Sequence, residues 1–226
     1  MKPSYCNLRE FLKHNRLFYG FYLLVILVSA YYLLNYDKLM LHQFINYFVG
    51  NKAVDGFYKY FTHVGDGVFA VIIGVLVLIK NVRQGIFVLV SYAIAGGLAS
   101  IIKWSVNYTR PHHVFSYYKK HIDIRYVDGV EMIGEHSFPS GHSTAAFSVF
   151  TALALSTKNQ FLKLVYLFIA LNAAFSRTYL SQHWLVDITA GSLIGVTFAT
   201  LLYFLVYCNK NIVAKFDRPL ISPKAE

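Results

Sequence analysis

Six long apolar runs dominate the sequence of 226 residues. A helix of about 20 apolar residues is long enough to cross the hydrocarbon core of a bilayer. The two shortest runs fall well below this length, so we expect their helices to continue into neighbouring polar residues. The pattern predicts an all-α bundle of six transmembrane helices, in a single domain over residues 1–226. The runs are Leu17–Leu34, Val64–Ile79, Ile86–Ile102, Thr144–Leu155, Phe161–Phe175 and Val186–Tyr207.

The composition agrees with a membrane protein and excludes a nucleic-acid-binding one. Hydrophobic residues make up 56% of the chain and charged residues 14%. The net charge of +10 comes from basic residues scattered among apolar runs, whereas nucleic-acid-binding domains gather them in one stripe or patch. The first run is longer than the core of a secretory signal, and no A-x-A-like cleavage site follows it. We therefore expect an uncleaved first helix.

Lys and Arg residues predict the orientation in the membrane. Basic residues concentrate in short cytoplasmic loops. One set of loops and both termini carry 12 of them, which predicts that both termini are cytoplasmic and that the opposite end faces the periplasm or exterior. A compact chain of this kind is expected in a bacterial inner membrane. These basic residues are Lys2, Arg9, Lys13, Arg16, Lys80, Arg83, Lys158, Lys163, Lys210, Lys215, Arg218 and Lys224.

Three further features of the sequence lead to structural predictions. Cys6 and Cys208 fall at the predicted cytoplasmic end, so we expect free thiols and no disulfide. The segment Lys38–Thr62 mixes apolar and polar residues at helical spacing, which suits either a helix in the membrane interface or a packed cap outside it. Asp66 is expected to cap the second span, with a role in shaping a pocket as the alternative.

Three polar clusters stand at the predicted outer ends of spans. An even number of crossings separates them, so all three fall on the same face of the membrane. A shared site requires this placement. The clusters are Lys103-x6-Arg110-Pro111, Pro139-Ser140-Gly141-His142 and Ser176-Arg177-x5-His183-x3-Asp187.

The charges of these clusters predict an anion site. Lys103, Arg110 and Arg177 supply three strong cations and two histidines add imidazoles, against one local carboxylate. Phosphate is the natural ligand, because guanidinium groups bind its oxygens in pairs. Lys103 and Arg110 lie about two helical turns apart and share a helix face if the third span continues outward. Pro111 biases Arg110 away from helix and is expected to end the helix there.

The second and third clusters predict an anion seat and a nucleophile. Ser140 is a good N-cap, Gly141 allows close approach to the backbone, and free N–H groups at a helix start bind anions. His183 and Asp187 are four residues apart, so the carboxylate can hold one imidazole nitrogen while the other faces phosphorus. His142 would then protonate the departing oxygen and later activate water.

These residues resemble the pattern of the type 2 phosphatidic acid phosphatase superfamily, K-x6-RP, PSGH and SR-x5-H-x3-D, over residues 103–187. The resemblance implies a membrane phosphatase that needs no metal or other cofactor. It implies that His183 attacks, Asp187 orients it and His142 acts as acid. It also implies phosphate-binding roles for the remaining motif residues, which are Lys103, Arg110, Ser140, Gly141 and Arg177.

Other functions fit the same motifs. A soluble haloperoxidase of this superfamily is disfavoured by six spans, whereas a lipid phosphotransferase and a non-catalytic lipid-phosphate-binding protein stay open. The substrate is expected to be a lipid phosphate, with phosphatidic acid, phosphatidylglycerol phosphate, undecaprenyl pyrophosphate and lipid A as candidates. The sequence does not choose among these lipids. Four loop histidines, His112, His113, His121 and His136, are assigned no role.

Overall fold

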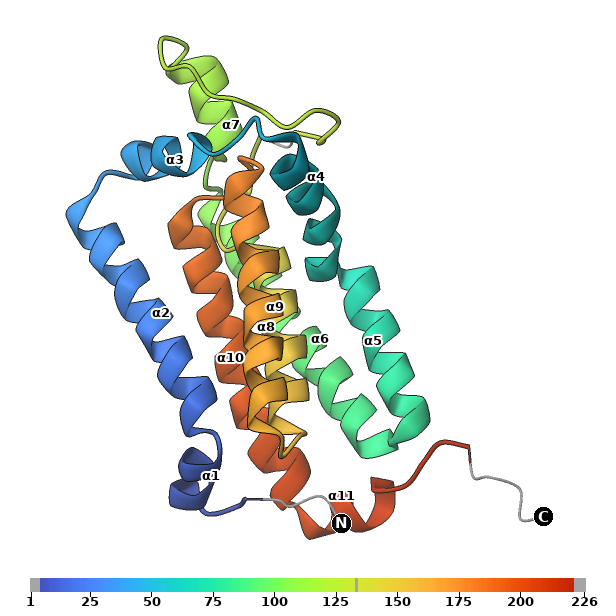
Figure 1. Cartoon of the computed structure of the whole chain (residues 1–226). Helices are drawn as coiled ribbons and strands as arrows, with labels where there is room; N and C mark the ends of the chain where they lie inside the picture. The colour runs from blue at the N-terminus through green and yellow to red at the C-terminus, as the bar shows by residue number, and fades with distance from the viewer. Residues whose placement is uncertain (1–4, 133, 222–226) are drawn as a thin grey trace.

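The computed structural model describes residues 5–132 and 134–221, and this part of the chain contains helices and no strand. Its six longest helices run side by side as a bundle (Figure 1). They are α2 (Arg16–Asn35), α5 (Gly67–Lys80), α6 (Val82–Val106), α8 (Gly141–Leu155), α9 (Gln160–Tyr179) and α10 (Leu185–Cys208).

Shorter helices close the two ends of this bundle. At the end that carries both termini lie α1 (Leu8–His14) and α11 (Lys210–Phe216). At the other end lie α3 (Lys38–Asn46), α4 (Lys52–Phe61) and α7 (Pro111–His113), together with the 3₁₀ helix η1 (Thr62–Gly65) and the π-helical turn η2 (Val114–Tyr118).

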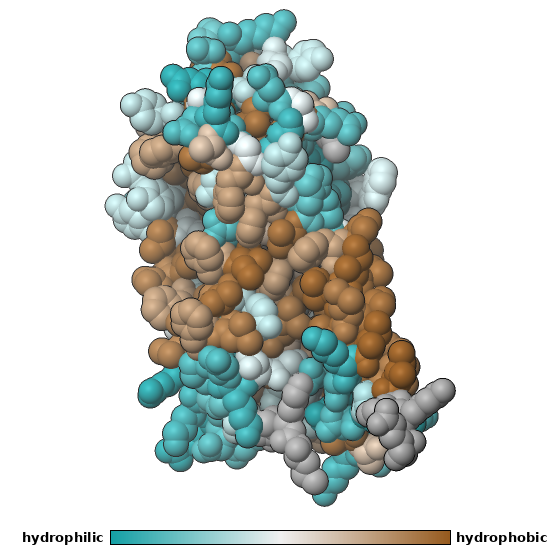
Figure 2. Space-filling model, turned by 45° about the vertical axis from the view of Figure 1, so that its right-hand side comes forward, coloured by the Kyte–Doolittle hydropathy of each residue, from teal (hydrophilic) through white to brown (hydrophobic). Residues whose placement is uncertain are grey.

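On the face shown in Figure 2, apolar surface forms a belt across the middle of the molecule, between two hydrophilic ends. Within the described residues, α2, α9, α10 and the segment beginning with α6 are each long and apolar enough to cross a membrane. The helices on either side of Asp66 are bent by 60° and together form a fifth candidate. The chain is therefore an all-helical integral membrane protein with four or five clear candidate spans.

The two short apolar runs do extend into the motif residues, as the sequence predicted. α8 begins at Gly141, and α9 continues to Tyr179 and so includes Arg177. α8 occupies the centre of the bundle, where nearly all of its side chains are buried. It approaches α10 closely at Gly195, where a Cβ atom would lie 2.8 Å from the backbone nitrogen of Ser148. The central helix is thus fixed by backbone-to-backbone packing.

The prediction that Lys103 and Arg110 share one helix face is wrong. α6 ends at Val106, because Asn107 adopts the left-handed conformation with φ 43° and its N–H donates to the Lys103 carbonyl. Asparagine tolerates this conformation better than most residues. Arg110 is extended, with ψ 155°, as expected before Pro111, which begins α7. Pro111 therefore lies five residues beyond the last residue of the helix.

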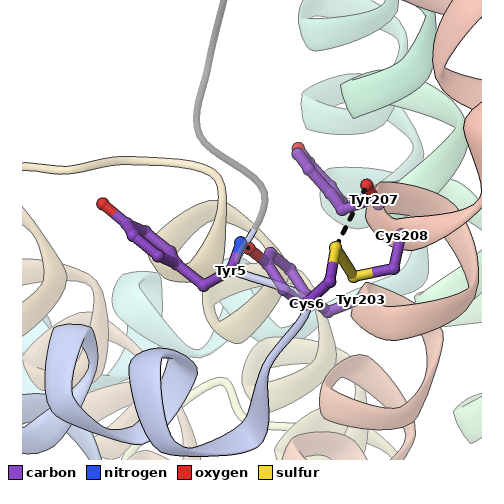
Figure 3. Close-up of a disulfide and its surroundings, with 5 residues drawn as sticks. All are labelled: Tyr5, Cys6, Tyr203, Tyr207 and Cys208. Atoms are coloured by element: carbon purple, nitrogen blue, oxygen red, sulfur yellow. Dashed lines mark hydrogen bonds between the residues drawn. A yellow bond between two sulfur atoms is a disulfide. The ribbon is translucent and has the colours of Figure 1, made fainter.

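The predicted free thiols are also wrong, because Cys6 and Cys208 form a disulfide (Figure 3). α1 returns the N-terminal segment to the end of α10, where Phe11 is buried and the Tyr5 N–H donates to the Tyr203 hydroxyl at 3.0 Å. The two cysteine Cα atoms are 5.4 Å apart although 202 residues separate them in the sequence. Only the packing of the two chain ends reveals this pair.

The segment Lys38–Thr62 forms α3 and α4, and it combines both predicted characters. α3 packs inward through His42, whose Nε2 lies 3.0 Å from the Ser181 hydroxyl, and through Asn46, whose amide bonds the backbone of Arg125. Its opposite face exposes Met40 and Phe44. The segment is a packed cap with an apolar outer side.

Candidate active site

The fold brings the three polar clusters together at one end of the bundle. The backbone N–H of Ser140 donates to the carbonyl of Asp187 at 3.1 Å, which joins the second cluster to the third. The Trp184 indole N–H donates to the carbonyl of Thr109 at 2.8 Å, which joins the third cluster to the first. The common membrane face predicted for the clusters is thus matched by direct contact between them.

His183 lies in a tight turn between α9 and α10 and is 1% exposed. The turn is closed by two N–H groups, those of Gln182 and His183, which both donate to the Arg177 carbonyl at 2.9 and 3.1 Å. The Nδ1 atom of His183 is 3.4 Å from Oδ2 of Asp187. The carboxylate therefore faces one ring nitrogen, and Nε2 is the nitrogen that can meet a substrate.

Asp187 is held in place by two further donors. Its Oδ2 atom accepts from the backbone N–H of Trp184 at 2.8 Å and from the hydroxyl of Ser137. The Ser137 hydroxyl is also 3.4 Å from Nδ1 of His183. Fixed donors keep a buried carboxylate in one orientation, so the His183–Asp187 pair is preorganised.

The electrostatic surroundings favour an uncharged nucleophile. Burial lowers the pKa of His183 well below 6.5, and the positive charges of Arg110, Arg177, Lys103 and His142 lower it further. All four charges lower the pKa of His183 because they lie near its imidazole ring. His183 is therefore unprotonated at neutral pH and has a lone pair available for attack.

Two arginines line the site and are oriented by neutral partners. Arg110 donates from Nε to the Glu135 carbonyl at 2.9 Å and from Nη1 to the Gln182 side chain at 3.1 Å. Arg177 donates from Nη1 to the Thr62 hydroxyl at 2.8 Å, and its buried Nε has no partner among the described residues. Each guanidinium has five N–H donors, so both keep donors for an anion.

The start of α8 has the geometry of an anion seat. Ser140 caps this helix, as predicted, because its hydroxyl accepts from the Ser143 N–H at 3.3 Å. The N–H groups of Gly141 and His142 have no hydrogen-bond partner in the described part of the chain. A Cβ at Gly141 would lie 3.7 Å from Nζ of Lys103, so this cation faces the same helix start. The Ser140 hydroxyl is buried and accepts from the Ser143 N–H, and its role in phosphate binding stays a prediction.

His142 has a carboxylate partner that the sequence analysis assigned elsewhere. Asp66 does stand at the N-cap position of α5, but its side chain makes no capping hydrogen bond. Its Oδ1 atom lies 2.6 Å from Nε2 of His142 instead. The predicted side-chain cap is therefore wrong, because the carboxylate of Asp66 contacts His142.

Two cavities flank the segment Thr62–Asp66. One of about 370 Å³ is lined by His142 and by glycines of α5 and α6. The other, of about 330 Å³, is lined by the charged residues Arg177, Lys59 and Glu131 among others. The segment thus separates a glycine-lined cavity from a cavity that Arg177 borders.

Several contributors were missed by the sequence analysis. Ser137, Thr62 and Gln182 contact motif side chains, yet they lie outside the motif positions and only tertiary packing identifies them. The four loop histidines were left without a role. Among the described residues, none of their rings hydrogen-bonds to a predicted site side chain; His136 reaches only the Lys103 carbonyl, at 3.4 Å.

We find no candidate metal site within residues 5–132 and 134–221. No three His, Cys, Asp or Glu side chains there lie close enough together to hold a metal ion. The polar groups that converge here are mainly cations, imidazoles and N–H donors, and the carboxylates of Asp66 and Asp187 contact the two imidazoles. Such a set suits an anion better than a cation.

An apolar helical bundle with this site defines an integral membrane phosphatase. Residues 84–210, more than half of the chain, match the family model of the PAP2 superfamily. The chain belongs to this superfamily and is a phosphoric ester hydrolase of the phosphatidic acid phosphatase type 2 class.

Two crystal structures share the fold. LpxE from Aquifex aeolicus aligns with a TM-score of 0.65 and 21% identity, covering 74% of this chain and 95% of that chain. The first transmembrane PAP2-type phosphatidylglycerolphosphate phosphatase from Bacillus subtilis aligns with a TM-score of 0.63 and 21% identity, covering 83% of this chain and 95% of that one. No curated protein sequence matches the chain significantly.

Proposed function

We propose that this chain is a metal-independent lipid phosphatase that works through a phosphohistidine on His183. The observation that carries the proposal is the buried His183–Asp187 pair surrounded by three cations, with Nδ1 and Oδ2 3.4 Å apart. Lys103, Arg110 and Arg177 would bind the phosphate oxygens, and the N–H groups of Gly141 and His142 would add backbone donors.

The reaction has two steps. The Nε2 atom of His183 attacks phosphorus, and His142 protonates the lipid oxygen that leaves. A water molecule, deprotonated by His142, then cleaves the phosphorus–nitrogen bond and releases inorganic phosphate. The cations stabilise the charge on the phosphoryl oxygens in both steps.

The glycine-lined cavity supports a lipid substrate. His142 protonates the leaving group, so the lipid part of the substrate must lie on the side of His142. The cavity on that side is lined by Gly65, Gly67, Gly96 and Gly97 among others, and a Cβ at Gly97 would meet nothing within 4 Å. An alkyl or prenyl chain could pass there from the bilayer, while the cavity that Arg177 and Lys59 border offers phosphate a route to water.

We further propose that all six long helices cross the membrane. α8, with 15 residues, is shorter than a usual span, but its burial inside the bundle removes it from contact with lipid. The basic residues of the end with both termini favour the cytoplasm. The site would then open to the periplasm or exterior, and LpxE and the Bacillus subtilis phosphatase are bacterial neighbours of the same fold.

The test is phosphate release by purified protein in detergent, with chelator present and without an acceptor alcohol. The panel contains phosphatidic acid, phosphatidylglycerol phosphate, undecaprenyl pyrophosphate and lipid A. We expect release from at least one lipid and none with the His183→Ala variant. Release by that variant, or transfer to an added alcohol with no hydrolysis, would contradict the proposal.

A further inference from the structure

We propose that Asp66 is a positioning residue for His142, which fixes the tautomer of its ring and stabilises its protonated form. The inference rests on the proposed function, because it assumes that His142 is the acid and base. It adds a second histidine–carboxylate pair to the site, in a different role from His183 and Asp187.

The carboxylate of Asp66 binds two histidine rings. Its Oδ1 atom is 2.6 Å from Nε2 of His142, a short distance typical of charge-assisted hydrogen bonds. Its Oδ2 atom is 2.7 Å from Nδ1 of His63. His63 is mostly exposed, with 68% of its side chain accessible, so the pair is connected to water through this ring.

Asp66 is available for this role because α5 does not need its side chain. The Asp66 carbonyl accepts the first intrahelical bond of α5, from the Ala70 N–H at 3.0 Å, and this bond does not involve the side chain. The side chain makes no capping bond. Replacing the carboxylate therefore leaves the capping of α5 unchanged.

The segment that carries Asp66 is held against the site from two sides. A Cβ at Gly65 would lie 3.0 Å from the Cβ of His142, so glycine permits direct contact with this residue. Thr62, in the same segment, accepts the hydrogen bond from Arg177 at 2.8 Å. The carboxylate thus has a fixed position relative to both a predicted phosphate ligand and the predicted acid.

The pair dictates which nitrogen of His142 meets the substrate. Nε2 is engaged by Asp66, and Nδ1 has no hydrogen-bond partner among the described residues. In the first step His183 forms the phosphorus–nitrogen bond, and the phosphorus–oxygen bond to the lipid breaks with its electron pair on the lipid oxygen. That oxygen takes the proton from Nδ1 of the His142 imidazolium, which becomes neutral and keeps the Nε2 proton towards Asp66.

The second step reverses the proton movement. The water oxygen bonds to phosphorus, a water proton passes to Nδ1 of His142, and the phosphorus–nitrogen electron pair returns to His183. Asp66 stabilises the imidazolium that forms again. A carboxylate on the far nitrogen thus assists both steps without contacting the substrate.

The test compares two substrates that differ in their need for a proton. One is a long-chain alkyl phosphate, whose alkoxide must be protonated, and the other is an alkyl-chain-bearing nitrophenyl phosphate, whose phenolate leaves unaided. The value of kcat/KM reports on phosphohistidine formation. We expect Asp66→Ala to lower it by on the order of a hundredfold for the alkyl phosphate and by less than about threefold for the nitrophenyl phosphate.

Reference variants separate this role from a structural one. His142→Ala should show the same dependence on the leaving group, and Asp66→Asn, which loses the charge but keeps one acceptor, an intermediate loss. Asp128→Ala is the matched control, because Asp128 is exposed and its carboxylate has no hydrogen-bond partner in the described residues. Equal losses on both substrates, or no loss in either Asp66 variant, would overturn the inference. If the wild-type protein hydrolyses neither substrate, the proposed function is wrong instead.

Discussion

The backbone N–H of Ser140 donates to the carbonyl of Asp187 at 3.1 Å, so the anion seat and the nucleophile's carboxylate partner are joined through the main chain. The contact lies where α8 begins and α10 completes its first turn. Because both groups are backbone atoms, no side-chain substitution at these two positions deletes the bond directly. The spacing between the phosphate seat and the His183–Asp187 pair is therefore a property of how α8 packs on α10.

Gly191→Ala is expected to disturb that packing. A Cβ at Gly191 would lie 2.6 Å from the Ser140 carbonyl oxygen, so α8 must shift away from α10. Overpacking of this kind costs about 1–3 kcal/mol of folding free energy, and we expect activity to fall tenfold or more, at roughly the scale seen for small misplacements of reacting groups. Thermal unfolding and phosphate release measure the two effects.

Gly20→Ala is the control for this prediction. Gly20 lies in α2, and a Cβ there would meet nothing within 4 Å. Alanine is the better helix former, so stability should be equal or slightly higher. Unchanged activity in the Gly191 variant would contradict the importance of the contact.

Ser137→Ala should lower turnover more than stability. The hydroxyl donates to Asp187 and lies beside Nδ1 of His183, so its loss frees the carboxylate to move. We expect a loss in kcat of roughly tenfold to a hundredfold, the range for preorganised contacts near the reacting groups. Ser148→Ala removes an equally buried hydroxyl that bonds only to the Ala145 carbonyl, and it should retain activity. Similar losses in both variants would remove Ser137 from the site.

Chelators should leave activity intact, and vanadate should inhibit in competition with substrate. Cations and N–H donors neutralise the phosphoryl charge in the proposed mechanism, so no metal ion is required. The measurement is phosphate release with excess chelator, before and after readdition of divalent metal. Loss of activity that metal restores would contradict the mechanism.

Cys208→Ser is expected to leave kcat unchanged and to lower the unfolding temperature under oxidising conditions. The disulfide with Cys6 ties the N-terminal segment to the end of α10, at the opposite end of the bundle from the site. Cross-links that close long loops stabilise the folded state, mainly by restricting the unfolded chain. Equal unfolding temperatures for the wild-type protein and the Cys208→Ser variant, both measured without reductant, would contradict a stabilising role of the disulfide.

The same pair reports on the orientation in cells. On the cytoplasmic side both cysteines should be kept reduced, and a membrane-permeant maleimide alone should label them. Labelling by an impermeant reagent after reduction would place the termini outside and overturn the proposed orientation.

Helices and the contact between His183 and Asp187 could be predicted from the sequence because both have local signatures. Apolar runs matched α2 and α10 to within one residue at each end and α6 to within four, and the spacing of four residues places His183 beside Asp187. The early end of α6 was missed because it depends on one left-handed residue, Asn107. A helix that ends five residues before the proline cannot be recognised from the proline alone.

Long-range partners were the other source of error. Asp66 was expected to cap α5, since position and residue type fit a cap, but a histidine 76 residues away in the chain takes its carboxylate. The Cys6–Cys208 disulfide was missed for the same reason. In each case the deciding contact is tertiary, and no local pattern records it.

Trapping the covalent intermediate tests the central claim most directly. The His142→Ala variant should form phosphohistidine from an alkyl-chain-bearing nitrophenyl phosphate labelled at phosphorus, but hydrolyse it slowly for lack of a base. Rapid quenching and peptide mapping should then find an acid-labile, alkali-stable label on the peptide containing His183. A label on any other residue, or turnover by wild-type protein with no trapped label in the variant, would contradict the account.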